Sequence, residues 1–105
     1  MGGASSKSRF ADGFADLLVK DIDPSEHEFW DDLWKATLAI DEVFELISMA
    51  DTRKLIAERP GNLRTLFTQA VVQLYQVVET PFPQYFEQAL SCIRILSRII
   101  PVMRE

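Results

Sequence analysis

The sequence is poor in the residues from which most catalytic and metal sites are built. Its 105 residues include one cysteine, Cys92, and one histidine, His27. A single cysteine excludes an internal disulfide and a cysteine-built zinc site, which is typical of a reducing cytosolic compartment. Cys92 falls in an apolar stretch and His27 in an acidic one, so no nucleophile and base are paired. We therefore expect no enzyme activity, no catalytic residue, no metal site and no cofactor.

Positive charge and long apolar runs are also scarce. The chain has 11 basic and 16 acidic residues, a formal net charge of −5. No general basic field exists to hold nucleic acid, and no glycine-rich phosphate loop indicates a small-molecule substrate. No stretch approaches the length of a membrane-spanning helix, and the polar residues 4–9 exclude a signal peptide. A membrane would therefore be reached through a lipid or not at all.

Acidic residues gather near the start of the chain. Between Asp12 and Asp32 there are eight acids against a single base, Lys20. Part of this run resembles a calcium loop, but Glu26 stands where such a loop needs glycine, and Asp32 is shorter than the bidentate glutamate of its last position. We interpret the run as a solvated face, with a surface for a basic partner as the alternative.

The N-terminal residues carry the clearest functional signal. Met1-Gly2-Gly3-Ala4-Ser5-Ser6 fits the pattern M-G-x-x-x-[ST], in which Met1 is removed and a myristoyl chain is joined to the amine of Gly2. Lys7 and Arg9 would then face anionic lipid headgroups. This predicts lipidation at Gly2 with electrostatic support from Lys7 and Arg9. The alternative is that Met-Gly is the incidental start of a soluble domain.

The rest of the chain has the apolar period of helices. Residues 1–8 are small and polar and predict a flexible leader, followed by one helical domain over residues 9–105. Proline-containing breaks predict short helices over about 10–20, 25–38, 39–49, 51–58, 62–80 and 84–100. The segment 39–49 is either a bent continuation of its predecessor or a separate helix. Expected N-terminal caps are Ser25, in a capping box with Glu28, and also Asp51 and Asn62.

One expected helix has an unusually heavy apolar stripe. Phe29, Trp30, Leu33 and Trp34 share one side of the segment that follows Pro24, opposite Asp31 and Asp32. We interpret the four apolar residues as core anchors. At least one of the two indoles is expected to be buried against the Leu66–Val78 helix.

No segment alternates with the period of a strand, so the predicted fold class is all-α. Short connections favour antiparallel neighbours, either an irregular bundle or the start of an α-solenoid of the HEAT or armadillo kind. The last helix is apolar over much of its circumference, and we expect Ile93, Leu96, Ile99 and Ile100 or their neighbours to be partly exposed. Such a face would normally be covered by further helices of a longer array, and an isolated chain would self-associate.

Several blocks resemble one known family. They are the Met-Gly start with Ser6-Lys7, then Glu28-Phe29-Trp30-Asp31-Asp32-Leu33-Trp34, Asp41-Glu42-Val43-Phe44-Glu45-Leu46, Pro60-Gly61-Asn62-Leu63-Arg64-Thr65-Leu66 and Arg94-Ile95-Leu96-Ser97-Arg98-Ile99-Ile100-Pro101. In this order they resemble the N-terminal region of the high-temperature-induced dauer-formation family, which is related to dymeclin. Gly2 matches the acylated glycine of that family, and its members are much longer than this chain.

The resemblance implies a function that composition alone does not. It implies a myristoylated, non-catalytic protein on the cytosolic face of the Golgi and trans-Golgi network, which acts in the sorting of secretory and dense-core vesicles. The implied partners are a membrane surface and unidentified proteins. The alternative is a soluble helical module for protein–protein interaction without a lipid anchor.

Overall fold

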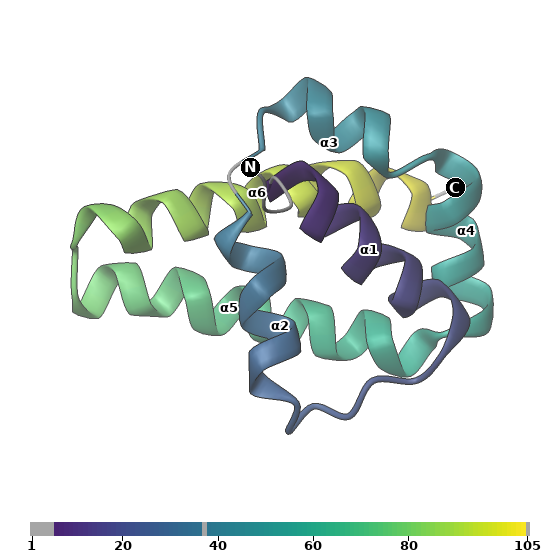
Figure 1. Ribbon diagram of the computed structural model, residues 1–105, viewed down its shortest axis with the longest axis horizontal. Coiled ribbons are helices and arrows are strands. Elements are labelled where there is room, and N and C mark those ends of the chain that lie inside the picture. The colour runs from purple at the N-terminus through teal and green to yellow at the C-terminus, as the bar shows by residue number, and fades with distance from the viewer. Residues whose placement is uncertain (1–5, 37, 105) are drawn as a thin grey trace.

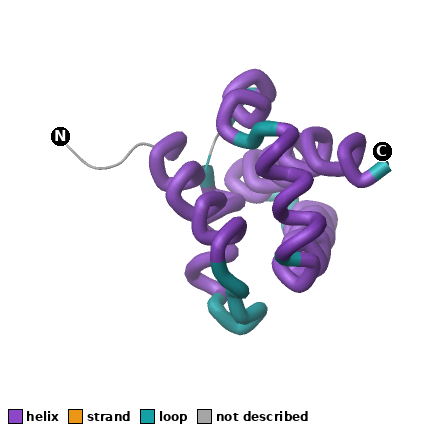
Figure 2. The backbone as a smooth tube through the Cα atoms, turned by 90° about the vertical axis from the view of Figure 1, so that its right-hand side faces the viewer, coloured by secondary structure: helices purple, strands orange, loops and turns teal. Residues whose placement is uncertain are grey.

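The computed structural model describes residues 6–36 and 38–104. Over these ranges the chain forms six helices and no strand (Figures 1 and 2). The helices are α1 (Ser6–Val19), α2 (His27–Lys35), α3 (Ile40–Leu46), α4 (Met49–Glu58), α5 (Pro60–Glu79) and α6 (Pro83–Met103). The predicted all-α fold class is confirmed.

The two longest helices, α5 and α6, form an antiparallel hairpin along the molecule (Figure 1). α6 also packs against α2, α3 and α4, while α1 packs against α2 and α4. Because α6 contacts four other helices, it needs apolar residues around most of its circumference. This central position accounts for the buried part of the wide apolar face that the sequence shows over this segment.

All six helices contribute to one core. Its largest fully buried side chains include Trp30, Trp34, Phe10, Leu17 and Leu66. α1 approaches α2 closely at Gly13, where an added Cβ would lie 3.1 Å from the Leu33 Cδ2 atom. The glycine that lowers the helix propensity of α1 therefore also allows close packing between two helices.

The capping box expected at the start of α2 does not form. α2 begins at His27 after Glu26, so Ser25 lies outside it. The Ser25 backbone N–H and hydroxyl both donate to the Asp23 Oδ1 atom, at 2.8 and 2.6 Å. Because Asp23 accepts both donors locally, they fix a turn before the helix. The same two hydrogen bonds lower the pKa of the Asp23 carboxyl group.

Two other caps also differ from the sequence prediction. At α4 the cap is Ser48, whose Oγ accepts the Asp51 N–H at 3.0 Å. α5 begins at Pro60, so Asn62 is inside the helix and does not cap its N-terminus. Proline favours the first helical position because its missing N–H is not needed there. The segment after Leu38 is a separate short helix, α3, which resolves the alternative left open by the sequence.

The ends of the chain differ from expectation by short segments. α1 begins at Ser6, so residues 6–8 of the predicted leader are helical. α6 continues through Pro101 to Met103, beyond the predicted stop near Ile100. Of the last-helix residues expected to be exposed, Ile93 and Ile100 are 49% and 40% exposed, whereas Ile99 is fully buried.

Candidate functional site

The predicted lipidation residue, Gly2, lies outside the described residues. The two predicted membrane-facing bases lie in the first turn of α1 and are positioned differently. Lys7 Nζ donates to Glu45 Oε1 of α3 at 2.9 Å, an exposed ion pair between residues far apart in sequence. Arg9 is exposed and lines a shallow cavity together with Asp12, Asp16 and Asp32.

The ion pair with Glu45 changes the pKa of Lys7 and the field of its charge. The hydrogen bond to Glu45 and the charge of that carboxylate raise the Lys7 pKa, with smaller contributions from Glu42 and Asp41. The ammonium group therefore stays charged, but an acid already offsets its field. Nothing local in the sequence indicated this pair, because its members are 38 residues apart.

The C-terminal end of α1 is fixed by side chains from the start of α5. Asn62 Nδ2 donates to the carbonyl oxygens of Leu17 and Lys20 at 2.9 and 2.8 Å, and Asn62 Oδ1 accepts the Ile22 N–H at 2.9 Å. Arg59 Nη2 donates to the Val19 carbonyl oxygen at 2.7 Å. The last carbonyls of a helix lack partners within it, and here another segment supplies the donors. The C-terminal end of α1 is thus tied to α5.

Basic and hydroxyl side chains of α6 hold the segments around α3 in the same way. Ser91 Oγ donates to the Ala36 carbonyl oxygen at 2.8 Å, and Arg94 Nη1 donates to that of Leu38 at 2.8 Å. Arg98 Nε donates to the Ile47 carbonyl oxygen at 2.6 Å. None of these contacts was predicted from the sequence. The available signal was a pair of arginines, Arg94 and Arg98, four residues apart within the apolar C-terminal half of α6.

The four predicted core anchors are brought together as expected. Trp30, Leu33 and Trp34 are buried, and Phe29 is partly buried with its ring edge-on to that of Trp30. Trp30 Nε1 donates to the Asp23 carbonyl oxygen at 3.1 Å. α2 packs mainly against α1 and α6, so the indoles are buried as predicted but their principal neighbours differ from the predicted α5 segment.

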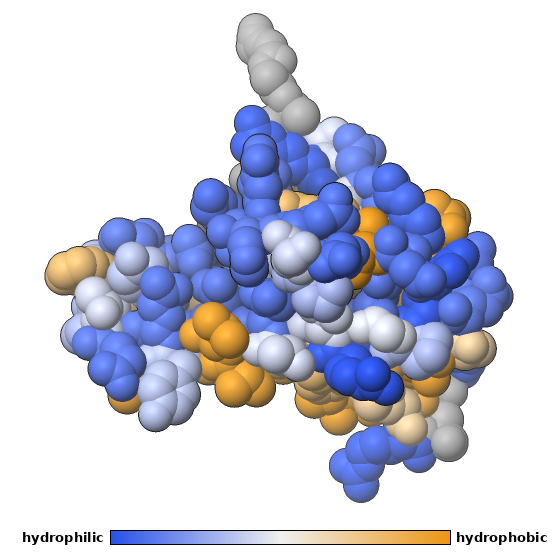
Figure 3. All heavy atoms as spheres, turned by 90° about the horizontal axis from the view of Figure 1, so that it is seen from below, coloured by the Kyte–Doolittle hydropathy of each residue, from blue (hydrophilic) through white to orange (hydrophobic). Residues whose placement is uncertain are grey.

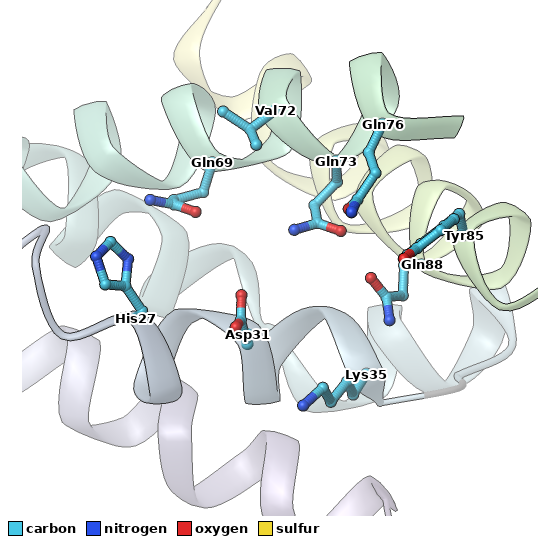
Figure 4. Close-up of a pocket in the computed structure, with 9 residues that line it drawn as sticks. All are labelled: His27, Asp31, Lys35, Gln69, Val72, Gln73, Gln76, Tyr85 and Gln88. Atoms are coloured by element: carbon cyan, nitrogen blue, oxygen red, sulfur yellow. The ribbon is translucent and has the colours of Figure 1, made fainter. Parts of the chain in front are cut away.

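A polar cavity of about 540 Å³ lies between α2, α5 and α6 (Figure 4). Most of the side chains that line it are polar. They are His27, Asp31 and Lys35 of α2, Gln69, Val72, Gln73 and Gln76 of α5, and Tyr85 and Gln88 of α6. Gln73 is 7% exposed and its Oε1 atom has no hydrogen-bond partner. These groups can form hydrogen bonds with a polar ligand.

The cysteine lies apart from this cavity. Cys92 is fully buried in the core, and desolvation raises the pKa of its thiol to about 12. The thiol is therefore protonated at neutral pH and is not a nucleophile there. Within residues 6–36 and 38–104 no group of His, Cys, Asp and Glu side chains could hold a metal ion.

The fold and these contacts define a class of protein: a small all-α domain in which charged and amide side chains mainly bind backbone ends of neighbouring helices. Residues 1–105 match the family described as High-temperature-induced dauer-formation protein, and the chain belongs to this family. No solved structure matches the chain. Among its described helices, none has the length and apolar character needed to cross a bilayer.

Curated relatives cover the entire chain. Protein HID1 of Mus musculus is 34% identical over 110 residues, and Protein HID1 of Homo sapiens is 33% identical over the same length. The Ubp5-interacting protein ftp105 of Schizosaccharomyces pombe is 31% identical. In each comparison all of this chain is covered, but it spans only 14% of the two mammalian relatives and 12% of the yeast protein.

Proposed function

We propose that this protein is an N-myristoylated, non-catalytic peripheral membrane protein on the cytosolic face of the Golgi and trans-Golgi network. Its helical body would bind other proteins during the sorting of secretory and dense-core vesicles. Family membership over the whole chain, together with a start that fits the acylation pattern at Gly2, is the observation that carries the proposal.

The physical requirements for such an anchor constrain the proposal. A single myristoyl chain gives only marginal membrane binding, on the order of 10⁴ M⁻¹, so a second contribution is needed. Arg9, exposed near the start of α1, can supply an attraction to anionic lipid. The name of the yeast relative, a Ubp5-interacting protein, supports a role in protein binding.

The test is intact mass followed by localisation. Protein made in eukaryotic cells should have lost Met1 and gained the mass of a myristoyl group. Gly2→Ala should lack this group and move from Golgi membranes to the cytosol. Equal membrane fractions for the wild type and Gly2→Ala would reject the lipid anchor.

The second candidate is a soluble helical interaction module with no lipid anchor. It is favoured by the ion pair between Lys7 and Glu45 and by the net charge of −5, both of which oppose attraction to an anionic membrane. Absence of the myristoyl mass, with cytosolic localisation of the wild type, would establish this alternative.

A further inference from the structure

An uncovered apolar face runs along the α5–α6 hairpin. Its members are large apolar side chains that are 40–79% exposed, here called the hairpin face: Val71, Tyr75, Val78, Phe86, Leu90, Ile93 and Ile100. The three members on α5 recur at i, i+4 and i+7, and those on α6 at i, i+4, i+7 and i+14. This spacing places each set on one side of its helix.

The hairpin face is as apolar as a surface that packs against another protein segment. The two helical stripes that contain its members also pass through Thr68 and Ser97, and charged residues fall on them only at their outer ends, at Arg64 and Arg104. Partly buried Phe67 and Leu96 pack against the core beneath the hairpin. Figure 3 shows apolar side chains gathered along one edge of the molecule. An extended apolar surface on a soluble protein often marks a site of interaction with another protein or with a membrane.

The position of the hairpin face argues against a membrane as its cover. α1, which follows the acylation signal, and α2 lie on one side of the hairpin, and the apolar edge lies on the other (Figures 1 and 3). A bilayer that held an acyl chain just before α1 would face the opposite side of the molecule. The hairpin face would then point toward the cytosol, where a protein surface is the cover that removes apolar groups from water.

The length of the relatives indicates which protein surface this is. The chain spans only 12–14% of HID1 and of ftp105, so these relatives carry a long polypeptide besides the matched segment. Two antiparallel helices with a shared apolar stripe bury it most simply against another helix pair, packed ridges into grooves, as successive repeats do in a solenoid. We propose that the hairpin face is the docking site for a further antiparallel helix pair of the same polypeptide in long members of the family.

The occupant is tested in the full-length mouse relative, whose 34% identity over the whole chain allows α6 to be aligned. A photo-crosslinking benzoylphenylalanine replaces the residue aligned with Ile93. The matched control carries it at the position of Ala57, which is exposed on α4 away from the hairpin face. We expect the first position to crosslink within one polypeptide, to a segment outside the 110 aligned residues, and the control to give no such crosslink. A crosslink to a second copy or to lipid, or none at all, would overturn the proposal.

A second measurement tests the exposed face in the 105-residue chain itself. Without an acyl chain and without a covering helix pair, the chain should self-associate as its concentration rises in sedimentation velocity. Ile93→Glu should abolish this association, whereas Ala57→Glu should leave it unchanged. A wild-type chain that stays monomeric across the concentration series would show that the hairpin face needs no cover.

Discussion

Asn62, in the first turn of α5, donates its side-chain amide to the carbonyl oxygen of Leu17 in α1 at 2.9 Å, across 45 residues of sequence. The contact is buried and belongs to a set of three, since the same amide also binds Lys20 and Ile22 backbone groups. One side chain thus supplies hydrogen-bond partners for three backbone groups at and just after the C-terminal end of α1.

Removing this side chain should destabilise the fold. Asn62→Ala leaves two carbonyls and one N–H of a partly buried segment without this partner, so we expect the free energy of unfolding to fall by about 1–3 kcal/mol. Urea denaturation measures it. Thr68→Ala is the control, because the exposed Thr68 hydroxyl binds only its own helix, and it should change stability by about 0.5 kcal/mol or less. Equal midpoints and slopes for Asn62→Ala and the wild type would refute the assigned role.

The two helical glycines should respond in opposite directions to enlargement. Gly13→Val places side-chain atoms against buried Leu33, and such overpacking costs roughly 1–3 kcal/mol. Gly61→Ala meets nothing within 4 Å and should stabilise the chain by about 0.4–1 kcal/mol through the unfolded state. Thermal unfolding of both variants is the measurement. A Gly13→Val protein as stable as the wild type would mean that α1 and α2 are not closely packed.

The two tryptophans should differ in their tolerance of phenylalanine. Both indoles are buried, but only Trp30 has a hydrogen-bond partner for its Nε1 atom, the Asp23 carbonyl oxygen. Trp30→Phe should therefore lower the free energy of unfolding by about 1 kcal/mol more than Trp34→Phe does. The two variants serve as controls for each other in chemical denaturation, since each loses a similar volume. The reverse order would contradict the assigned hydrogen bond.

The ion pair of Lys7 should weaken membrane binding of the acylated protein. Glu45→Gln removes the carboxylate that offsets the Lys7 charge, so partitioning to anionic vesicles should rise several-fold. Glu58→Gln, which makes the same change in net charge at an exposed position on α4, should have a smaller effect. Vesicle sedimentation of the myristoylated proteins compares them. Identical partitioning for the two variants would show that only net charge matters.

The buried thiol should make stability fall at high pH. The Cys92 pKa is raised by desolvation from 9.0 to about 12 on folding, so between these values the unfolded chain has lost a proton that the folded chain keeps. Stability is unaffected below pH 9 and is lost above it, by up to about 1.4 kcal/mol per pH unit. Denaturation of the wild type and Cys92→Ala from pH 8 to 10.5 should show this slope only in the wild type. Parallel curves would exclude a contribution from this thiol.

The sequence alone determined the fold class and the positions of most helices. Apolar residues at helical spacing favour a helix, and Pro24, Pro60 and Pro81 mark helix boundaries. Both effects involve only residues close together in sequence, so they can be predicted without tertiary structure. The same local logic identified Trp30, Leu33 and Trp34 as core residues, and the family blocks identified the family.

Tertiary structure decided which partner each polar group takes. From its neighbours in sequence, Asn62 was predicted to cap its own helix, but it binds the end of α1. Lys7 was predicted to face lipid headgroups, but it pairs with Glu45. It also decided which side of α6 remains exposed, because Ile99 and Ile100 are equally apolar in sequence but only Ile99 faces the core. The physical reason is that a donor or an apolar surface binds whatever group folding brings beside it, and contacts across some 40 residues depend on how the helices pack.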